Sequence, residues 1–238
     1  HTSGPSWPCH VSLGGELVAD TVDVGWSDDG RWAQLLVESA KVAGVDRPAV
    51  LHEHADGEAL LKSIRQRAHS LDVERCSQYT APGTHGDTTY LCTAEVDGLA
   101  VSLIQSNASG FGSWLVEPST GINLHDRGLG FSLVPGHPAE FGPSRRPPHT
   151  LSPALATRDG ELVSVFGTMG GDAQPQILLQ VAARLFGEGV SPATAINAPR
   201  WALAGPTTGF DTWDDPASQR VEIEAHAPDI WRRDLEAR

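Results

Sequence analysis

Thr88 is the residue whose type and position could best supply a nucleophile. It opens the segment TTYLCTA and follows YTAPGTHGD (79–87), whose proline, glycine and aspartate content indicates an exposed turn. A threonine hydroxyl at such a junction can attack the preceding carbonyl carbon and form an ester, and hydrolysis of that ester would free an amino terminus on Thr88. That amine, with an ordinary pKa of about 7.7–8.0, could serve as the base for its own hydroxyl. Alternatively, the β-branched pair Thr88 and Thr89 simply favours a strand.

The glycine pair in FGTMGGD (166–172) is the second candidate. A strand that runs into Gly170 and Gly171 and then into a helix can direct backbone N–H groups at one point, and such a point can hold an oxyanion. The same two glycines also suit a sharp strand-to-helix turn with no chemical role. The residues alone leave both interpretations open.

Polar clusters elsewhere give weaker signals. Arg127, in the loop sequence HDRG, could bind an anionic substrate, although short polar clusters in loops are more often exposed turns. His52 and His54 have the spacing of a metal pair, but no third ligand follows at helical spacing, so we interpret them as solvated surface. The three cysteines lack the paired spacing of a zinc site. We therefore expect no metal, and the nucleophilic chemistry of Thr88 would need no organic cofactor.

Charge narrows the class of partner. The 238 residues carry 17 Lys and Arg against 30 Asp and Glu, a formal net charge of −13. A surface of that sign repels phosphate backbones and anionic lipids, so we expect neither nucleic acid nor membrane as a partner. No apolar run approaches the roughly 20 residues that span a bilayer, and no signal sequence is recognisable. The sequence gives no cellular location.

Hydrophobic spacing predicts the elements that must position these groups. Apolar residues recur at helical spacing in 31–44 and 57–70. From Thr88 the period changes to two, and the Asp97-Gly98 pair is typical of a hairpin turn. The stretch 107–153 is rich in glycine and proline and suits a pocket built from loops. Further along we expect a strand at 161–168, a helix at 175–189 ended by glycine, and a short helix over 191–199.

From Gly86 to about Trp201 the sequence resembles the catalytic half of gamma-glutamyltransferases. The resemblance rests on five motifs in family order: the string from GDTTYLC to SGFGSW, then TGINLHDRGLGFSLVPGHP, RRPPHTLSPAL, GTMGGDAQPQ and APRW. Residues 4–70 resemble, less specifically, the end of the family's large subunit. GDTTYLC, QSN, DRGLGF, HTL and MGGDAQPQ look closer to the branch with oxamate amidohydrolase-like and acylase-like members.

The resemblance implies an α+β fold, the four-layer α/β/β/α sandwich of N-terminal-nucleophile hydrolases, of which this chain would supply an incomplete part. Residues 1–87 would be the C-terminal part of the large subunit, helical and ending in a processing loop. Residues 88–238 would be the small catalytic subunit without its C-terminal end. The partner of the chain would then be the missing N-terminal region of the large subunit, which carries the family's arginine for the substrate carboxylate.

The resemblance also assigns roles to residues. Thr88 would be the nucleophile, freed by self-cleavage after Asp87, and Thr89 and Ser106 would support it. Gly170 and Gly171 match the glycine pair whose N–H groups form the family's oxyanion hole.

Departures from the family pattern concern the substrate. Gly130 stands in place of the acidic residue that holds an α-amino group, and His149 and Thr150 replace the serines that hold an α-carboxylate. Ala108 replaces an asparagine, and Trp114 replaces a glycine and could narrow the pocket. We therefore expect His149, Thr150 and Arg127 to contact a small amide other than a gamma-glutamyl compound.

Three functions stay open at this point. The first is a self-processing amide hydrolase or acyltransferase acting on a small amide. The second is a true gamma-glutamyl (glutathione) hydrolase or transferase. The third is a truncated, non-catalytic remnant.

Overall fold

The computed structural model describes residues 29–68, 88–206 and 209–237. Its α-helices are α2 (Gly30–Gly44), α3 (Arg47–Val50), α4 (Gly57–Ala68), α5 (Gln174–Ala182), α6 (Pro192–Asn197) and α7 (Asp229–Ala237). The strands are β1 (Thr88–Ala94), β2 (Ala100–Ser106), β3 (Val116–Glu117), β4 (Ile122–Asn123), β5 (Ala154–Arg158), β6 (Glu161–Phe166), β7 (Trp201–Ala204) and β8 (Arg220–Ile223). Short 3₁₀ turns span Arg127–Gly130, Gly171–Ala173 and Pro216–Ser218, and a π-helix, Ala183–Glu188, continues α5.

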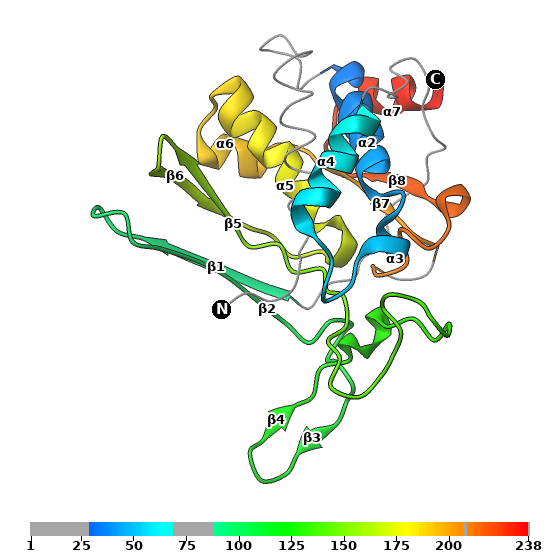
Figure 1. Ribbon diagram of the computed structural model, residues 1–238. Coiled ribbons are helices and arrows are strands. Elements are labelled where there is room, and N and C mark those ends of the chain that lie inside the picture. Colours follow the sequence, from blue (N-terminus) through cyan, green and yellow to red (C-terminus); the bar gives the residue numbers. More distant parts are fainter. Residues whose placement is uncertain (1–28, 69–87, 207–208, 238) are drawn as a thin grey trace.

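The strands of the described residues pair as four antiparallel hairpins: β1 with β2, β3 with β4, β5 with β6 and β7 with β8. Strand β6 lies beside β1 and β2, so the β1–β2 and β5–β6 hairpins are neighbours in space. The helices gather on one side of these two hairpins, and the β3–β4 hairpin extends away from the rest (Figure 1). The loop-rich part of the chain therefore lies apart from the helical core.

Helix α2 is the central helix of that core. It begins after Asp29, whose Oδ1 accepts the Arg31 N–H at 3.0 Å and satisfies one of the unpaired donors at a helix start. Trp32 and Leu36 are fully buried, and the helix packs against α7, α4, α5 and β7. A helix that meets four elements needs more than one apolar face, which explains why most of its residues are buried.

A buried arginine lies within the aromatic core. Trp32 of α2 and Trp231 of α7 stack with ring centroids 5.5 Å apart. Arg184 is only 2% exposed, and its guanidinium carbon lies 4.4 Å from the Trp32 ring centroid and 5.9 Å from that of Trp231. Its Nη2 donates to the Pro199 carbonyl at 2.9 Å. Cation–π contact and hydrogen bonding replace part of the hydration that this charge loses on burial.

Two glutamines of α5 pair with the backbone of β7 as a neighbouring strand would. Gln176 accepts the Leu203 N–H at 2.6 Å and donates to the Leu203 carbonyl at 3.4 Å. Gln180 does the same with Trp201, at 3.0 and 2.8 Å. Four residues along a helix rise about 6.0 Å and two along a strand about 6.6 Å, so the two spacings match. All four backbone groups on this buried edge are therefore satisfied.

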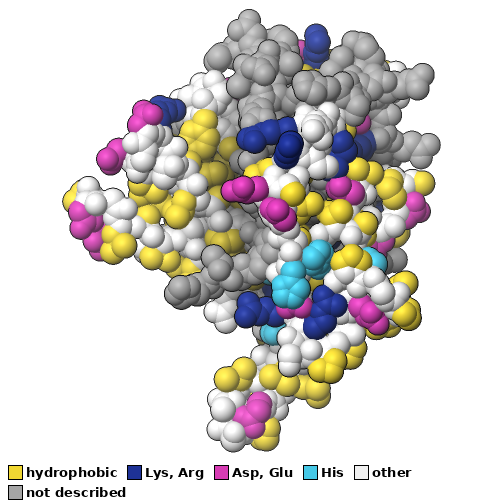
Figure 2. Space-filling model, in the orientation of Figure 1, with side chains coloured by type: hydrophobic (Ala, Val, Ile, Leu, Met, Phe, Trp, Pro, Cys, Tyr) yellow, Lys and Arg dark blue, Asp and Glu magenta, His cyan; other side chains and the backbone are white. Residues whose placement is uncertain are grey.

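The β1–β2 and β5–β6 hairpins present apolar side chains to solvent. Leu91 and Leu103 lie opposite each other in the register and are 47% and 41% exposed. Leu155 and Val163 are exposed on the other hairpin. Apolar side chains are abundant over both hairpins on the face shown in Figure 2.

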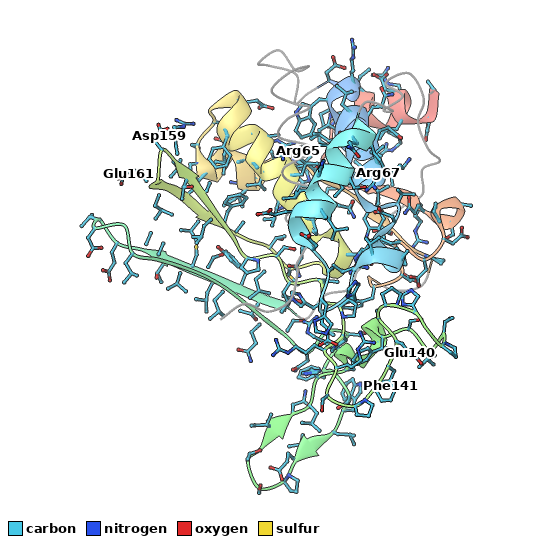
Figure 3. The ribbon with its side chains drawn as sticks, viewed as in Figure 1. Arg65, Arg67, Glu140, Phe141, Asp159 and Glu161 are labelled. Carbon is cyan, nitrogen blue, oxygen red and sulfur yellow. The ribbon has the colours of Figure 1, made fainter. Side chains whose placement is uncertain are left out.

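Most elements expected from hydrophobic spacing are confirmed. The structure places helices at 30–44 and 57–68, the hairpin around Asp97-Gly98, and the helix from 174 that ends before Gly189 in a left-handed conformation. Ser191 caps the short helix by accepting the Thr194 N–H at 3.1 Å. Arg67 of α4, which Figure 3 labels, forms an ion pair with Asp46 at 2.7 Å. No described helix is both long and apolar enough to cross a membrane.

Replacing Gln176 with methionine should destabilise the fold strongly. The substitution keeps the volume but leaves the Leu203 N–H and carbonyl buried without partners, which costs about 2–5 kcal/mol. The matched control is Gln66→Met at an exposed position of α4, which should change the free energy of unfolding by less than about 0.5 kcal/mol. Urea denaturation measures both, and equal midpoints for the two variants would contradict the strand-like role of Gln176.

Candidate active site

Thr88 and Ser106 form the first part of the candidate site. They lie directly opposite each other in the β1–β2 register. The Thr88 Oγ1 donates to Ser106 Oγ at 3.0 Å, and Ser106 Oγ also accepts the Ala108 N–H at 3.0 Å. Ser106 is thus held by its own loop and orients the threonine hydroxyl. Thr89 is exposed and faces the opposite side of β1, because side chains alternate along a strand.

The glycine turn forms the second part. Gly170 and Gly171 have φ angles of +125° and +55°, which favour glycine. A Cβ on Gly171 would lie 2.5 Å from the Gly209 carbonyl oxygen, and that oxygen accepts the Asp172 N–H at 2.9 Å. Within the described residues, the N–H groups of Gly170 and Gly171 donate to no protein acceptor. Two adjacent donors therefore stay available for a ligand.

Packing between β1 and the end of β6 connects these two parts. The Tyr90 ring lies against Gly167, where any Cβ would overlap it, and the Tyr90 hydroxyl lies 3.1 Å from Ser102 Oγ. Gly167 is three residues before Gly170, and Tyr90 is two residues after Thr88. The turn and the strand-initial threonine are consequently held on neighbouring strands. Asp87 lies outside the described residues.

A cavity of about 270 Å³ is the third part. All three residues expected to contact substrate, Arg127, His149 and Thr150, line it together with Gly130 and Ala108. Thr88 and the glycine pair are not part of this lining. Figure 2 shows histidine and arginine side chains gathered between the helical core and the β3–β4 hairpin. The lining is completed by Arg47, Pro48, Leu51, Leu129, Phe131, Ser132, His137, Ala139, Pro148, Phe210 and Asp214.

Arg127 is a cation of this cavity that is connected to the candidate nucleophile, Thr88, through Ser106. Its Nη2 donates to the Ser106 carbonyl at 3.3 Å. Burial lowers the pKa of the guanidinium from its ordinary value, and the neighbouring Asp126 carboxylate acts in the opposite direction. The group stays charged at neutral pH because arginine does not deprotonate in proteins. Within the described residues Arg127 forms no ion pair, so its charge is available to an anion.

One of the departures from the family pattern has a structural reason. A Cβ on Gly130 would lie 2.6 Å from the Pro148 carbonyl oxygen, so backbone fills the place of a side chain there. Ala108 is buried in the cavity wall with φ +80°, a conformation that asparagine adopts more readily than alanine, so nothing in the structure explains this replacement. Trp114 also has a positive φ, but it is 77% exposed, packs on Phe111 and does not line the cavity. That Trp114 narrows the substrate pocket therefore stays a prediction, and this cavity gives it no support.

Sequence reasoning missed one charged pair at the cavity. Arg47, from the short helix α3, lines the cavity, and its Nη2 lies 2.9 Å from Oδ1 of the buried Asp172. Burial raises the pKa of Asp172 to about 6, while Arg47 and the Thr212 backbone N–H lower it. Nearby Asp214 and Asp211 raise it further. Only the position of Asp172 after the glycine pair could have pointed to it.

No group of three or more potential metal ligands occurs among the described histidine, cysteine, aspartate and glutamate residues. His52 and His54 lie with ring centroids 6.5 Å apart, and the His54 side chain is largely exposed. Glu53 between them is bound by Arg145 at 2.9 Å, and this hydrogen bond is the main cause that lowers the Glu53 pKa. The segment thus connects α3 to the loop that carries Arg145.

Comparison with solved structures identifies the class of protein to which this fold belongs. The chain matches the crystal structure of cephalosporin acylase from Bacillus halodurans with a TM-score of 0.77 at 31% identity, over 96% of this chain and 41% of that one. It has the α+β fold of an N-terminal-nucleophile hydrolase, as expected from the sequence. A family model described as Gamma-glutamyltranspeptidase matches residues 25–238. The chain belongs to the gamma-glutamyltranspeptidase family.

Relatives within the family have more than one activity in their names. The chain is 37% identical over 199 residues to the oxamate amidohydrolase proenzyme of Klebsiella pneumoniae, covering 81% of this chain and 38% of that protein. It is 35% identical over 176 residues to the glutathione hydrolase-like YwrD proenzyme of Bacillus subtilis, covering 72% of this chain and 34% of that protein. The chain therefore spans little more than a third of the length of these two relatives.

Replacing Gly171 with alanine should disrupt the glycine turn. Besides its positive φ, the new Cβ would overlap the Gly209 carbonyl, so the turn must shift. Gly160→Ala is the matched control, because Gly160 also has a positive φ (+87°) but nothing within 4 Å of a Cβ. We expect a loss of about 1 kcal/mol for Gly160→Ala and about 1–3 kcal/mol more for Gly171→Ala. Denaturant titration measures the difference, and equal losses would show that the Gly209 contact is unimportant.

Proposed function

We propose that the protein is an N-terminal threonine amidohydrolase or acyltransferase that cleaves itself between Asp87 and Thr88. The observation that carries this proposal is the hydrogen bond of Thr88 Oγ1 to Ser106 Oγ at 3.0 Å, at the first residue of a strand. The proenzyme names of both family relatives support it. The small catalytic subunit would then begin at Thr88, and residues 1–87 would belong to the large subunit.

The proposed self-processing and turnover use only groups of the polypeptide chain together with water or an acceptor amine. In self-processing, the Thr88 hydroxyl adds to the Asp87 carbonyl carbon, the C–N bond breaks, and water then hydrolyses the resulting ester. In turnover, the freed Thr88 amine takes the hydroxyl proton as Oγ1 attacks the substrate amide carbon. The N–H groups of Gly170 and Gly171 stabilise the oxyanion that forms. The proton passes to the leaving amine, and water or another amine resolves the acyl ester on Thr88.

A small amide that carries a carboxylate is the substrate class that the cavity favours. The Arg127 guanidinium, which forms no ion pair among the described residues, can hold a carboxylate, and His149 and Thr150 add polar contacts. At Gly130 the Pro148 carbonyl occupies the position where an acidic side chain would bind an α-ammonium group. This arrangement argues against gamma-glutamyl compounds, the main alternative. The remaining part of the large subunit is the proposed protein partner.

Self-cleavage should depend on the Thr88 hydroxyl. Intact-mass spectrometry of the purified protein should show two products that meet between Asp87 and Thr88, whereas Thr88→Ala should remain a single species. The control is Thr93→Ala, an exposed threonine on the same strand, which should process normally. A processed Thr88→Ala protein would overturn the proposal, and an unprocessed parent protein would favour the reading of a non-catalytic remnant.

The Arg127 charge should govern recognition of acidic amides. Arg127→Gln removes a charge-assisted hydrogen bond to substrate, so we expect KM for oxamate to rise about 10- to 100-fold. Hydrolysis of a neutral amide such as acetamide should change far less. The control is Arg158→Gln at the exposed end of β5. A parent enzyme that strongly prefers a gamma-glutamyl anilide to oxamate would contradict the proposed substrate class.

A further inference from the structure

The buried ion pair between Arg47 and Asp172 has no role in the chemistry described so far. Asp172 directly follows the glycine pair and is 3% exposed. Its backbone N–H is bound by the Gly209 carbonyl, and its carboxylate lies 2.9 Å from Arg47 Nη2. Arg47 comes from α3, on the other side of the Asp87–Thr88 bond, and it lines the cavity. Asp172 therefore connects the glycine turn to Arg47 in the cavity wall.

The protonation state of Asp172 affects the charge that the cavity presents to a ligand. Two arginines line the cavity, and within the described residues only Arg47 is paired with a carboxylate. An ionised Asp172 neutralises Arg47, so Arg127 remains as the cation that an anionic ligand meets. A protonated Asp172 would leave Arg47 without an ion-pair partner as well. The protonation state of Asp172 thus changes the net charge at the cavity wall by one unit.

We propose that Asp172 is a positioning residue of the substrate cavity: it holds Arg47 in the wall and neutralises it, so that a substrate carboxylate is directed to Arg127. The proposal rests on the proposed function, because it assumes an anionic substrate in this cavity. Its consequence is a limit on affinity. The enzyme holds an acidic ligand less tightly than two free arginines would, and it holds the ligand at the arginine that is bonded to Ser106.

Several titratable groups face this pair and must be separated from it. Asp211 and Asp214 act on the Asp172 carboxyl, and both raise its pKa. The cavity also contains His137 and His149, whose protonation would attract anions as well. Because these groups are common to the parent and to an Asp172→Asn variant, the difference between the two binding profiles isolates Asp172.

The first experiment tests the contact without requiring activity. It uses the protein with Thr88→Ala, so that processing and turnover play no part, and it measures urea midpoints at pH 8 and pH 5. Arg47→Met should lower the midpoint more at pH 8, where Asp172 is left charged and buried, than at pH 5. Adding Asp172→Asn should restore most of that loss at pH 8. If the second substitution restores nothing, or if the first prevents folding and the second does not rescue it, Asp172 does not hold Arg47.

The second experiment measures oxamate binding by calorimetry to the same Thr88→Ala protein, with and without Asp172→Asn. Removing the carboxylate should strengthen binding about three- to ten-fold at pH 8, because one negative charge near the cavity wall is lost. Near pH 5, where Asp172 is largely protonated in the parent, the two affinities should converge. Weaker or equal binding of the variant at pH 8 would indicate a purely structural residue and overturn the proposal. If neither protein binds oxamate, the proposed substrate class fails, and the urea midpoints still decide whether Asp172 holds Arg47.

Discussion

The antiparallel register of β1 and β2 is the constraint on which the candidate site depends. It places Thr88 opposite Ser106, and a slip of one residue would turn Thr88 to the other face of the hairpin. Ser106 then serves two partners: its hydroxyl accepts from Thr88, and its carbonyl accepts from Arg127. The proposed nucleophile and the proposed carboxylate-binding cation are thereby positioned through a single residue.

Packing explains how the segments on either side of Thr88 stay together. Helix α2 lies before Thr88 in the sequence, yet Trp32 and Leu36 share one core with α5, α7 and the β7–β8 hairpin. Two ion pairs also connect the segment before Thr88 with the segment after it: Arg47 with Asp172, and Glu53 with Arg145. Cutting the bond before Thr88 would remove one covalent connection from an interface that buried apolar surface already maintains.

Local signals predicted the elements well, because they depend on neighbours in sequence. Asp97-Gly98 indicated the hairpin, Gly189 the end of a helix, and Ser191 the start of the next. The loop stretch 107–153 indicated a pocket, but the contribution of α3 to its wall could not be derived in this way. Arg47 and His149 are about a hundred residues apart and meet only through tertiary packing. The exposure of Trp114 could not be predicted either, since a side chain in a loop has no periodicity that reveals its face.

The pairing of Gln176 and Gln180 with β7 has a consequence for association between chains. An unpaired strand edge is a template on which another chain can add a strand, and proteins protect such edges in several ways. Here the hydrogen-bonding positions of Leu203 and Trp201 are already occupied by side-chain amides. An invading strand would have to displace two buried amides and leave them without partners. The β7–β8 sheet is therefore closed to growth on this side by side chains of its own covering helix.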